Sequence, residues 1–304
     1  MKIIITGGAG FIGAHSGRLL LGRGHEVHAV DDLSHGKREA VPQGATLHVL
    51  DVRSPELLKL TAELRPEAVL HLAAQMDVRK SVADPAEDAS INVLGTINAL
   101  EAARRCGAKR FVFASSGGAV YGEQEQFPCS ESHPRRPASP YGTSKLCGEE
   151  YLLLWSRLHG LSTLALRYAN VYGPGQDPLG EAGVVAIFCG KLLKGETATI
   201  NGDGLQTRDY VYVEDVAMAN VLGLEGQVSG ALNVGTGRET NVVEIARGLS
   251  QALGLSQPPK HGPAAPGEQR RSVVDPSAIG KALGWHPTVQ LADGLARTAR
   301  WFAR

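Results

Sequence analysis

A tyrosine and a lysine four residues apart form the first pair in the chain that could move protons. Tyr141 and Lys145 lie in the segment 139–145, which reads SPYGTSK. A serine N-cap followed by proline at the first helical position predicts that a helix begins here, so both side chains share one helix face. A tyrosine hydroxyl, with an ordinary pKa of about 10, is a weak base at neutral pH. A neighbouring ammonium favours the phenolate, which could then remove a proton from a substrate hydroxyl.

The same spacing is common on helix surfaces and does not by itself indicate a catalytic pair. A glycine-rich turn near the N-terminus favours the redox interpretation, because it predicts a dinucleotide cofactor. Residues 6–13 read TGGAGFIG, with glycines at 7, 8, 10 and 13. The turn follows an apolar strand pattern and opens a helix, whose free N–H groups and dipole favour a pyrophosphate. We therefore expect a dinucleotide site in which Gly7, Gly10 and Gly13 let the backbone approach the ligand.

The second predicted strand ends in Asp31, about twenty residues beyond the turn, where a carboxylate accepts the ribose hydroxyls. The carboxylate would repel a 2′-phosphate, so the sequence favours NAD over NADP. The positive nicotinamide ring would further favour a phenolate at Tyr141.

Two more strand ends carry residues suited to a ligand. Asp51 and Val52 follow the third strand, and Leu72, Ala73 and Ala74 follow the fourth. Ligands bind at the carboxyl ends of strands in open α/β sheets, and small residues let a cofactor lie close. Asp51 could equally cap the helix expected to begin near Pro55, and both interpretations stay open.

A serine at the end of a further strand completes the candidate chemistry. Residues 116–122 read SGGAVYG after a strand at 110–115. The Ser116 hydroxyl could bridge a substrate oxygen and Tyr141, and the glycines after it leave room for a bulky ring.

The elements that must position these residues alternate strand and helix. Strands are expected at 3–6, 27–31, 45–50, 68–72, 110–115 and 162–168, and helices at 11–21, 55–64, 91–105 and 140–159. This order predicts an α/β fold with a doubly wound parallel (Rossmann) sheet. After about residue 170 the loops lengthen, and shorter helices are expected at 184–193, 214–224, 242–253 and 291–302. We expect a first domain at 1–170 and a smaller C-terminal α/β lobe at 171–304, some of whose segments return to the first domain.

Composition excludes several classes of protein. The 304 residues hold 31 basic and 31 acidic side chains, so there is no basic excess for binding nucleic acid. No apolar run of membrane-spanning length and no secretory leader are evident, which predicts a cytoplasmic protein. The four cysteines (Cys106, Cys129, Cys147, Cys189) are scattered without metal-binding spacing, so we expect reduced thiols and no metal site.

Taken together, the motifs resemble the extended short-chain dehydrogenase/reductases, and within them the UDP-glucose 4-epimerase group of the NAD-dependent epimerase/dehydratases. The matching segments are TGGAGFIG at 6–13, VDDLSHG at 30–36, HLAAQ at 71–75, SSGGAVYG at 115–122, SPYGTSK at 139–145, RYANVYGPGQ at 167–176, GDGLQTRDYVYVEDVA at 202–217 and NVGTG at 233–237.

The resemblance implies roles for individual residues. It implies a catalytic set of Ser116, Tyr141 and Lys145. It implies NAD contacts, besides the glycines and the catalytic pair, from Phe11, Ile12, Asp31, Asp32, Leu33, Ser34, Gly36, Asp51, Val52, Leu72, Ala73, Ala74, Asn92 and Tyr168. It implies nucleotide-sugar contacts from Ser116, Tyr141, Asn170, Arg208, Tyr210, Glu268 and Ser272.

Arg208 could fork onto a diphosphate, or pair on the surface with Asp203 or Asp209. Glu268 could accept a ribose hydroxyl, or be a solvated loop charge.

The chain departs from the family at four places, one of which is the segment 183–185, where the asparagine often seen near the nucleotide is missing. Ala265 stands where the family often has a phosphate-binding arginine, and Arg270 or Arg271 is the candidate replacement. Ser272 stands at the family's gate beside the sugar, where a small residue leaves space for an N-acetyl group. Residues 117–119 contain no acid, whereas the related dehydratases need an Asp-Glu pair there and the decarboxylases tend to have an acid.

These features predict an NAD-dependent 4-epimerase of a UDP-hexose (glucose/galactose, N-acetylated or uronate) that works through a 4-keto intermediate. The alternatives are an oxidoreductase with net NAD(H) turnover on another nucleotide sugar and, from a different class, a non-catalytic nucleotide sensor. The resemblance also implies a homodimer formed through the helices at 91–105 and 140–159.

Overall fold

The centre of the molecule is a seven-stranded sheet in which every strand pair is parallel. The computed structural model describes residues 1–178, 183–255, 258–264 and 269–304. The strands lie in the order β11-β6-β5-β4-β1-β2-β3, so the chain winds outward in both directions from β1. Their bounds are β1 (Lys2–Thr6), β2 (Glu26–Asp31), β3 (Thr46–Val49), β4 (Ala68–His71), β5 (Arg110–Ser116), β6 (Ser162–Tyr168) and β11 (Gly230–Val234). The predicted doubly wound sheet is confirmed.

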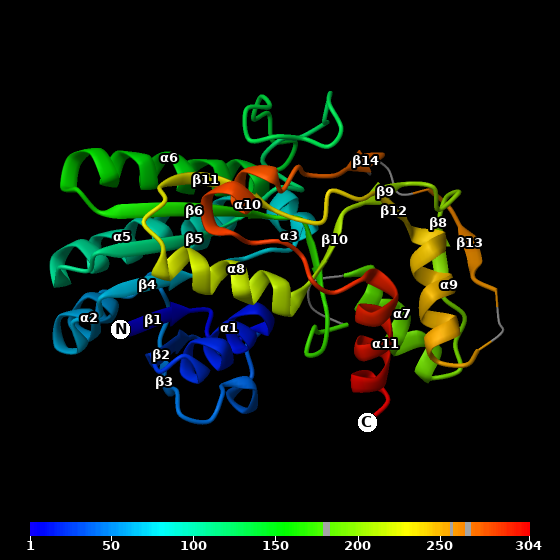
Figure 1. Cartoon of the computed structure of the whole chain (residues 1–304), viewed down its shortest axis with the longest axis horizontal. Helices are drawn as coiled ribbons and strands as arrows, with labels where there is room; N and C mark the ends of the chain where they lie inside the picture. Colours follow the sequence, from blue (N-terminus) through cyan, green and yellow to red (C-terminus); the bar gives the residue numbers. More distant parts are fainter. Residues whose placement is uncertain (179–182, 256–257, 265–268) are drawn as a thin grey trace.

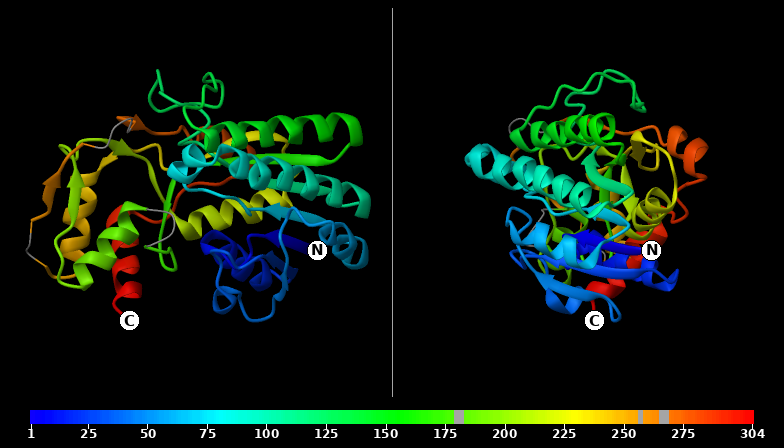
Figure 2. Two further views of the ribbon diagram at one scale, coloured as in Figure 1. Left: turned by 180° about the vertical axis from the view of Figure 1, so that it is seen from behind. Right: turned by 90° about the vertical axis from the view of Figure 1, so that its left-hand side faces the viewer.

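Helices cover both faces of this sheet, as the unbroken apolar strands require. On β1, Ile3 and Ile5 pack into one core with α1 (Phe11–Gly22) and α8 (Val213–Glu225). Ile4 points the other way, into a core shared with α2 (Glu56–Leu64), α5 (Gly95–Cys106) and α6 (Pro140–His159). Figure 1 shows α1 and α8 on one face, and the reverse view in Figure 2 shows α5 and α6 on the other.

A second, smaller lobe is built from short strands and three helices. The strand pairs are β7 (Asn170–Tyr172) with β10 (Tyr210–Tyr212), and β8 (Thr199–Asn201) with β13 (Lys260–Gly262). A three-stranded sheet joins β12 (Thr240–Asn241), β9 (Thr207–Arg208) and β14 (Arg271–Ser272). The helices α7 (Val184–Leu193), α9 (Val242–Ala252) and α11 (Leu291–Phe302) enclose a core that includes Phe188, Ile245 and Leu295. Figure 1 shows this lobe to the right of the large sheet.

Late segments of the chain also complete the large sheet. β11 pairs in parallel with β6, and α10 (Ser277–Leu283) places Ile279 in the core beneath it. The two lobes are therefore interwoven.

Short helices between β4 and α5 were not predicted. They are α3 (Val78–Ala83) and α4 (Pro85–Ala89), for which no element was expected. A π-helical turn η2 (Ser90–Leu94) then begins the helix that was expected from residue 91. Asp77 and Asp84 cap the two helices with their side chains, and Pro85 opens the second. A 3-10 turn η1 (Arg38–Ala40) follows β2.

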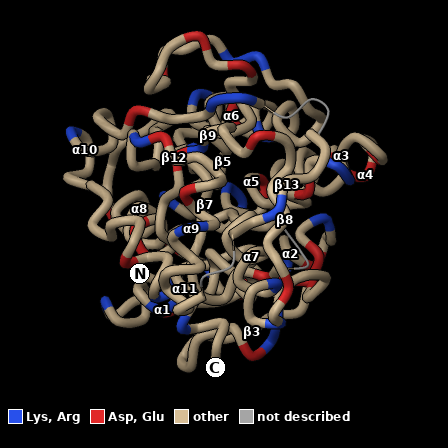
Figure 3. The backbone as a smooth tube through the Cα atoms, turned by 90° about the vertical axis from the view of Figure 1, so that its right-hand side faces the viewer, with Lys and Arg blue, Asp and Glu red and all other residues tan. Residues whose placement is uncertain are grey.

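Basic and acidic residues are interspersed over the described part of the chain, as Figure 3 shows for one view. No helix there combines the length and the apolar character needed to cross a bilayer.

Candidate active site

A cavity of about 1340 Å³ opens at the carboxyl ends of the parallel strands and extends between the two lobes. Pockets for single small molecules usually have volumes of about 300–1,000 Å³, so this one is large enough for two ligands side by side. Its wall contains the residues that end β2, β5 and β6 and those that directly follow β1 and β4, together with residues of β7, β8, β9 and β10. The position is that expected for a ligand in an open α/β fold.

The glycine-rich turn forms one wall with almost no spare space. Gly7 has φ +69°, and a Cβ added there would stand 2.8 Å from the Ala73 backbone nitrogen. Gly10 is the N-cap of α1 and has no side chain to bind the free N–H groups of the first turn. Gly7, Gly10, Phe11, Ile12 and Gly13 all line the cavity. A side-chain-free turn at a helix N-terminus suits a pyrophosphate, so these residues fit the expected dinucleotide.

Asp31 ends β2 beside this turn and also holds its shape. Its carboxylate accepts hydrogen bonds from the backbone N–H groups of Ala9 and Leu33, both at 2.9 Å. Burial raises the pKa of Asp31 above its ordinary value, and the two backbone bonds oppose that rise. Asp31 lines the cavity, and so do Asp32, Ser34 and Gly36, which were also predicted to contact NAD. Leu33 is not among the lining residues and contributes its backbone N–H to Asp31 instead.

Asp51 and Val52 line the cavity, which agrees with the expectation that they contact a ligand. The capping alternative for Asp51 is wrong, because α2 has Pro55 as its N-cap without a side-chain bond. Instead, the Arg53 guanidinium bonds to the Asp51 carboxylate at 2.7 Å and lowers its pKa. Arg53 also bonds to Glu87 of α4 at 2.9 Å. Both Arg53 and Glu87 line the cavity, and no sequence motif had pointed to them.

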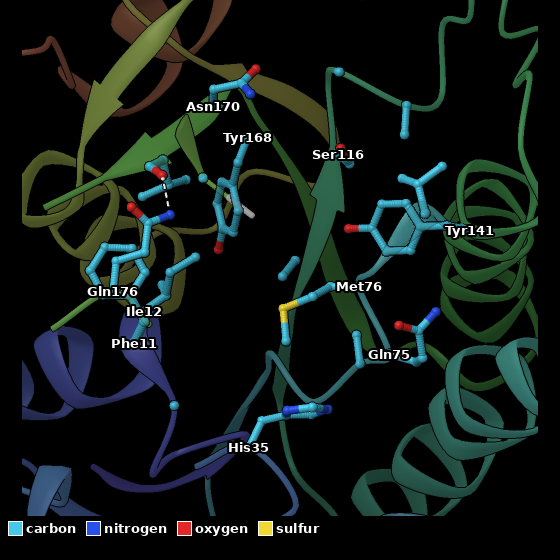
Figure 4. Close-up of a pocket in the computed structure, with 18 of the residues that line it drawn as sticks. Phe11, Ile12, His35, Gln75, Met76, Ser116, Tyr141, Tyr168, Asn170 and Gln176 are labelled. Atoms are coloured by element: carbon cyan, nitrogen blue, oxygen red, sulfur yellow. Dashed lines mark hydrogen bonds between the residues drawn. The ribbon is translucent and has the colours of Figure 1, made fainter. Parts of the chain in front are cut away.

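The candidate catalytic pair stands on the first turns of α6. The Ser139 hydroxyl accepts from the Gly142 N–H as the predicted N-cap. Lys145 is buried, donates to the Ala114 carbonyl at 2.8 Å and places its ammonium 5.8 Å from the centre of the Tyr141 ring. Figure 4 shows the Tyr141 ring pointing into the cavity with Ser116 above it at the end of β5. The structure thus brings the three predicted catalytic side chains to one wall.

His71, at the end of β4, is fully buried behind this wall. Its Nε2 lies 3.0 Å from the Thr96 hydroxyl, which donates its own proton to the Asn92 carbonyl, so Nε2 carries a proton and donates it. Nδ1 therefore accepts from the Thr6 hydroxyl at 2.7 Å. That hydroxyl accepts in turn from the Ala73 N–H of the loop that lines the cavity. Burial, aided by the charge of Lys145, lowers the pKa of His71 to about 3, so the ring is neutral.

Leu72, Ala73, Ala74 and Tyr168 line the cavity as predicted contacts, but Asn92 does not. Asn92 is buried behind the loop, where its amide accepts from the Gln75 N–H at 2.8 Å and donates to the Gln75 carbonyl at 2.7 Å. Gln75 and its neighbour Met76 line the cavity and were not predicted (Figure 4).

The opposite wall carries the expected substrate residues. Asn170, Arg208, Tyr210 and Ser272 line the cavity. Of the two carboxylates considered for Arg208, Asp203 bonds to Arg270 and Asp209 accepts from Thr236 and Gly237. Both carboxylates thus have partners of their own.

The candidate replacements for the family arginine point elsewhere. Arg270 pairs with Asp203 at 2.8 Å, and Arg271 pairs with Glu239 at 2.8 Å while its guanidinium stacks on Phe127. Neither is among the lining residues. Ala265 and Glu268 lie outside the residues that the structure describes.

Small residues meet near the predicted sugar position. A Cβ added to Gly118 would stand 4.0 Å from both the Ser116 and the Ser272 hydroxyls. Ser272 itself is only 4% exposed. This corner holds no side chain larger than serine at those three positions.

Comparisons with known proteins agree with this geometry. Residues 3–235 match the model of the NAD dependent epimerase/dehydratase family. The chain belongs to that family. A UDP-glucose 4-epimerase of Mycolicibacterium smegmatis is 44% identical over 99% of this chain and 98% of its own length.

Two solved structures are also similar over nearly the whole chain. One is the UDP-glucose 4-epimerase of Thermotoga maritima with UDP-glucose (44% identity, TM-score 0.97, 99% and 98% of the two chains). The other is the UDP-glucose 4-epimerase of Thermus thermophilus in complex with NAD (45% identity, TM-score 0.94, 99% of each chain). The predicted family, fold class and NAD dependence of this epimerase/dehydratase are confirmed.

Proposed function

We propose that this protein is an NAD-dependent 4-epimerase of UDP-hexoses. The observation that carries the proposal is the wall on which Ser116, Tyr141 and Lys145 meet beside the glycine-rich turn, without an acid at 117–119. Similarity to the UDP-glucose 4-epimerases supports it. The missing acid argues against dehydration, because no side chain directly after Ser116 could donate a proton to a departing hydroxyl. It also argues against decarboxylation, because the family's decarboxylases tend to have an acid at this position.

The cofactor would be held by the glycine-rich turn, Phe11, Ile12 and Asp31. When bound, NAD would supply the hydride chemistry at C4 of the sugar, accepting a hydride and returning it, so that none would be consumed over a turnover. Tyr141, as phenolate, removes the proton of the 4-hydroxyl and gives it back to the 4-keto oxygen. Lys145 favours the phenolate by its charge, and the Ser116 hydroxyl orients the sugar oxygen.

Epimerisation requires that the sugar turn over while its nucleotide stays bound. Arg208, Asn170 and Tyr210 line the cavity from the small lobe and would hold the nucleotide, since a guanidinium is suited to a diphosphate. A Cβ added to Gly118 would meet nothing closer than 3.9 Å, so this glycine leaves space beside Ser116, whereas Gly117 is packed against Val274 and does not. We assign these residues to substrate, and the cavity residues Asp51, Val52 and 72–74 to the cofactor.

The test is conversion of UDP-galactose to UDP-glucose by the purified protein, followed by chromatography of the sugar nucleotides. An epimerase reaches the same equilibrium mixture from either sugar without net formation of NADH. The oxidoreductase alternative instead predicts NADH formed or consumed in proportion to product. Absence of conversion for all UDP-hexoses, UDP-N-acetylhexosamines and UDP-hexuronates would reject the proposal.

The small corner at Ser272 favours a second substrate class. Serine beside Gly118 leaves room for a substituent on the sugar that a large gate residue would exclude. We therefore propose that UDP-N-acetylglucosamine is also a substrate, which the same assay decides.

We also propose a homodimer formed through α5 and α6. Leu153, Leu154 and Leu158 on α6 are 43%, 41% and 63% exposed, and a group of exposed leucines on one helix is typical of an interface. We further propose that residues 1–170 form the NAD-binding domain and residues 171–304 the sugar-nucleotide lobe. We also propose a cytoplasmic location, which the four free cysteines support.

A further inference from the structure

Asp88 is a buried carboxylate to which the proposed mechanism gives no task. It lies on α4, is 1% exposed and accepts three hydrogen bonds. The donors are Gln75 Nε2 at 2.9 Å and Asn92 Nδ2 at 3.0 Å, both to Oδ1, and the Ser144 hydroxyl at 2.7 Å to Oδ2. A buried carboxylate is costly unless such bonds satisfy its oxygens. Asp88 therefore ties α4 and the adjoining turn η2 to two segments that are farther away in the sequence, at Gln75 and at Ser144.

One of these ties reaches the helix of the catalytic pair. Ser144 directly precedes Lys145 and follows Tyr141 by three residues on α6. Its bond to Asp88 fixes this turn of α6 against α4, while Lys145 fixes the next residue against the Ala114 carbonyl of β5. These two bonds join consecutive residues of α6 to different elements, so they fix the rotation of α6 about its axis and its position along that axis relative to the sheet. They therefore fix the position of the Tyr141 hydroxyl.

The other two ties reach the loop that lines the cavity at 72–76. Asn92 binds both backbone groups of Gln75, and Asp88 binds its side chain. Asn92 belongs to the π-helical turn η2, a kind of irregularity that is frequent at functional sites. Figure 4 shows Gln75 and Tyr141 on the same side of the cavity. The loop and the catalytic helix are thus held by one carboxylate.

We propose that Asp88 is a positioning residue, which keeps the helix carrying Tyr141 and Lys145 in register with the loop at 72–76. The inference rests on the proposed function, because it concerns the geometry of that reaction. Asp88 itself does not line the cavity, so it acts through Ser144 and Gln75. Its role is to supply hydrogen bonds rather than charge.

Substitutions at Asp88 and Ser144 separate these roles. In Asp88→Asn, the carbonyl oxygen can still accept from Gln75 and Asn92, and the amide can donate to the Ser144 oxygen, so the ties survive without the charge. In Asp88→Ala all three are lost, and in Ser144→Ala only the tie to α6 is lost. Ser156→Ala, on the same helix and outside this network, is the matched control.

The measurements are kcat, KM and the pH dependence of kcat with UDP-galactose. Since a displacement of about 1 Å can cost about a hundredfold, we expect kcat to fall about tenfold to a hundredfold in Asp88→Ala and about tenfold in Ser144→Ala, with KM changed less than about threefold. Asp88→Asn and Ser156→Ala should stay within about threefold of the wild type. The pH profile of Asp88→Asn should superimpose on that of the wild type.

Several results would overturn the proposal. Wild-type kcat in folded Asp88→Ala or Ser144→Ala would show that the ties position nothing. A loss in Asp88→Asn as large as in Asp88→Ala, with a displaced pH profile, would assign an electrostatic role. If Asp88→Ala does not fold, Ser144→Ala and Asp88→Asn still decide.

A readout without turnover keeps this proposal distinct from the function. Hydrogen exchange of the NAD-loaded protein should quicken at 140–148 in Ser144→Ala and at both 140–148 and 72–76 in Asp88→Ala, but not in Ser156→Ala. Unchanged exchange would reject the positioning role. A wild-type protein that converts no UDP-hexose would reject the proposed function and leave this exchange test standing.

Discussion

The neutral, buried His71 predicts a specific loss of stability in acid. Burial and the charge of Lys145 lower its pKa in the folded protein from about 6.5 to about 3. Between these values the unfolded chain binds a proton on His71 and the folded protein does not, so the free energy of unfolding falls as the pH falls below about 6.5. The bond from the Thr6 hydroxyl to Nδ1 depends on the neutral ring, whereas Nε2 donates to Thr96 in either protonation state.

The size of the effect follows from the two pKa values. At about 1.4 kcal/mol per pKa unit, the contribution of His71 decreases by about 2 kcal/mol between pH 7 and pH 5, and by up to about 5 kcal/mol in strong acid. Other groups titrate over the same range, so the contribution of His71 is obtained as a difference between the wild type and His71→Asn, which has no proton to bind.

The assay is denaturant unfolding at pH 7 and pH 5, with NAD at one fixed concentration. His71→Asn should be less stable than the wild type at pH 7 but should lose about 2 kcal/mol less on going to pH 5. The exposed His286, changed to Asn, is the matched control and should follow the wild type. Equal losses in wild type and His71→Asn would refute the assignment of a neutral buried ring.

Three further changes test other parts of the account. Gly7→Ala places a methyl group against Ala73, in a left-handed backbone conformation that costs about 1–2 kcal/mol. The purified protein should therefore retain less NAD, as measured by absorbance after gel filtration. Full retention of NAD would contradict the close packing of the turn. Ser272→Tyr should reduce kcat/KM for UDP-N-acetylglucosamine at least about tenfold more than that for UDP-galactose. A parallel loss on both substrates would exclude Ser272 as a gate. Leu158→Glu should convert a dimer to a monomer in light scattering, and an unchanged mass would move the interface away from this end of α6.

The parts of the fold that were predicted from sequence are those with local signals. The helix α6 begins and ends at the expected residues, Pro140 and His159, because Ser139 caps it and Gly160 takes the left-handed conformation that ends it. The large parallel sheet follows from apolar strands at regular intervals. The short strands of the small lobe have no comparable signal, since two or three residues carry no periodicity.

The site was predictable where a motif carries its own physical reason, as in the glycine-rich turn. It was not predictable where position depends on tertiary contacts. Arg53 reaches the cavity through an ion pair with Asp51, and Gln75 through its bonds to Asn92 and Asp88. Asn92 was expected at the cofactor on resemblance, yet it binds the loop from behind. The spacing of residues in the sequence indicates neither that Arg53 and Gln75 reach the cavity nor that Asn92 lies behind the loop.

The most direct test of the central claim is the conversion of UDP-galactose by wild-type protein and by Tyr141→Phe, with UDP-glucose and NADH measured together. The wild type should form UDP-glucose to equilibrium without net NADH. Because general acid–base catalysis contributes about a hundredfold to ten-thousandfold, Tyr141→Phe should lose at least about a hundredfold in kcat while it retains its NAD. Conversion by Tyr141→Phe at the wild-type rate, or NADH formed in proportion to product, would contradict the account.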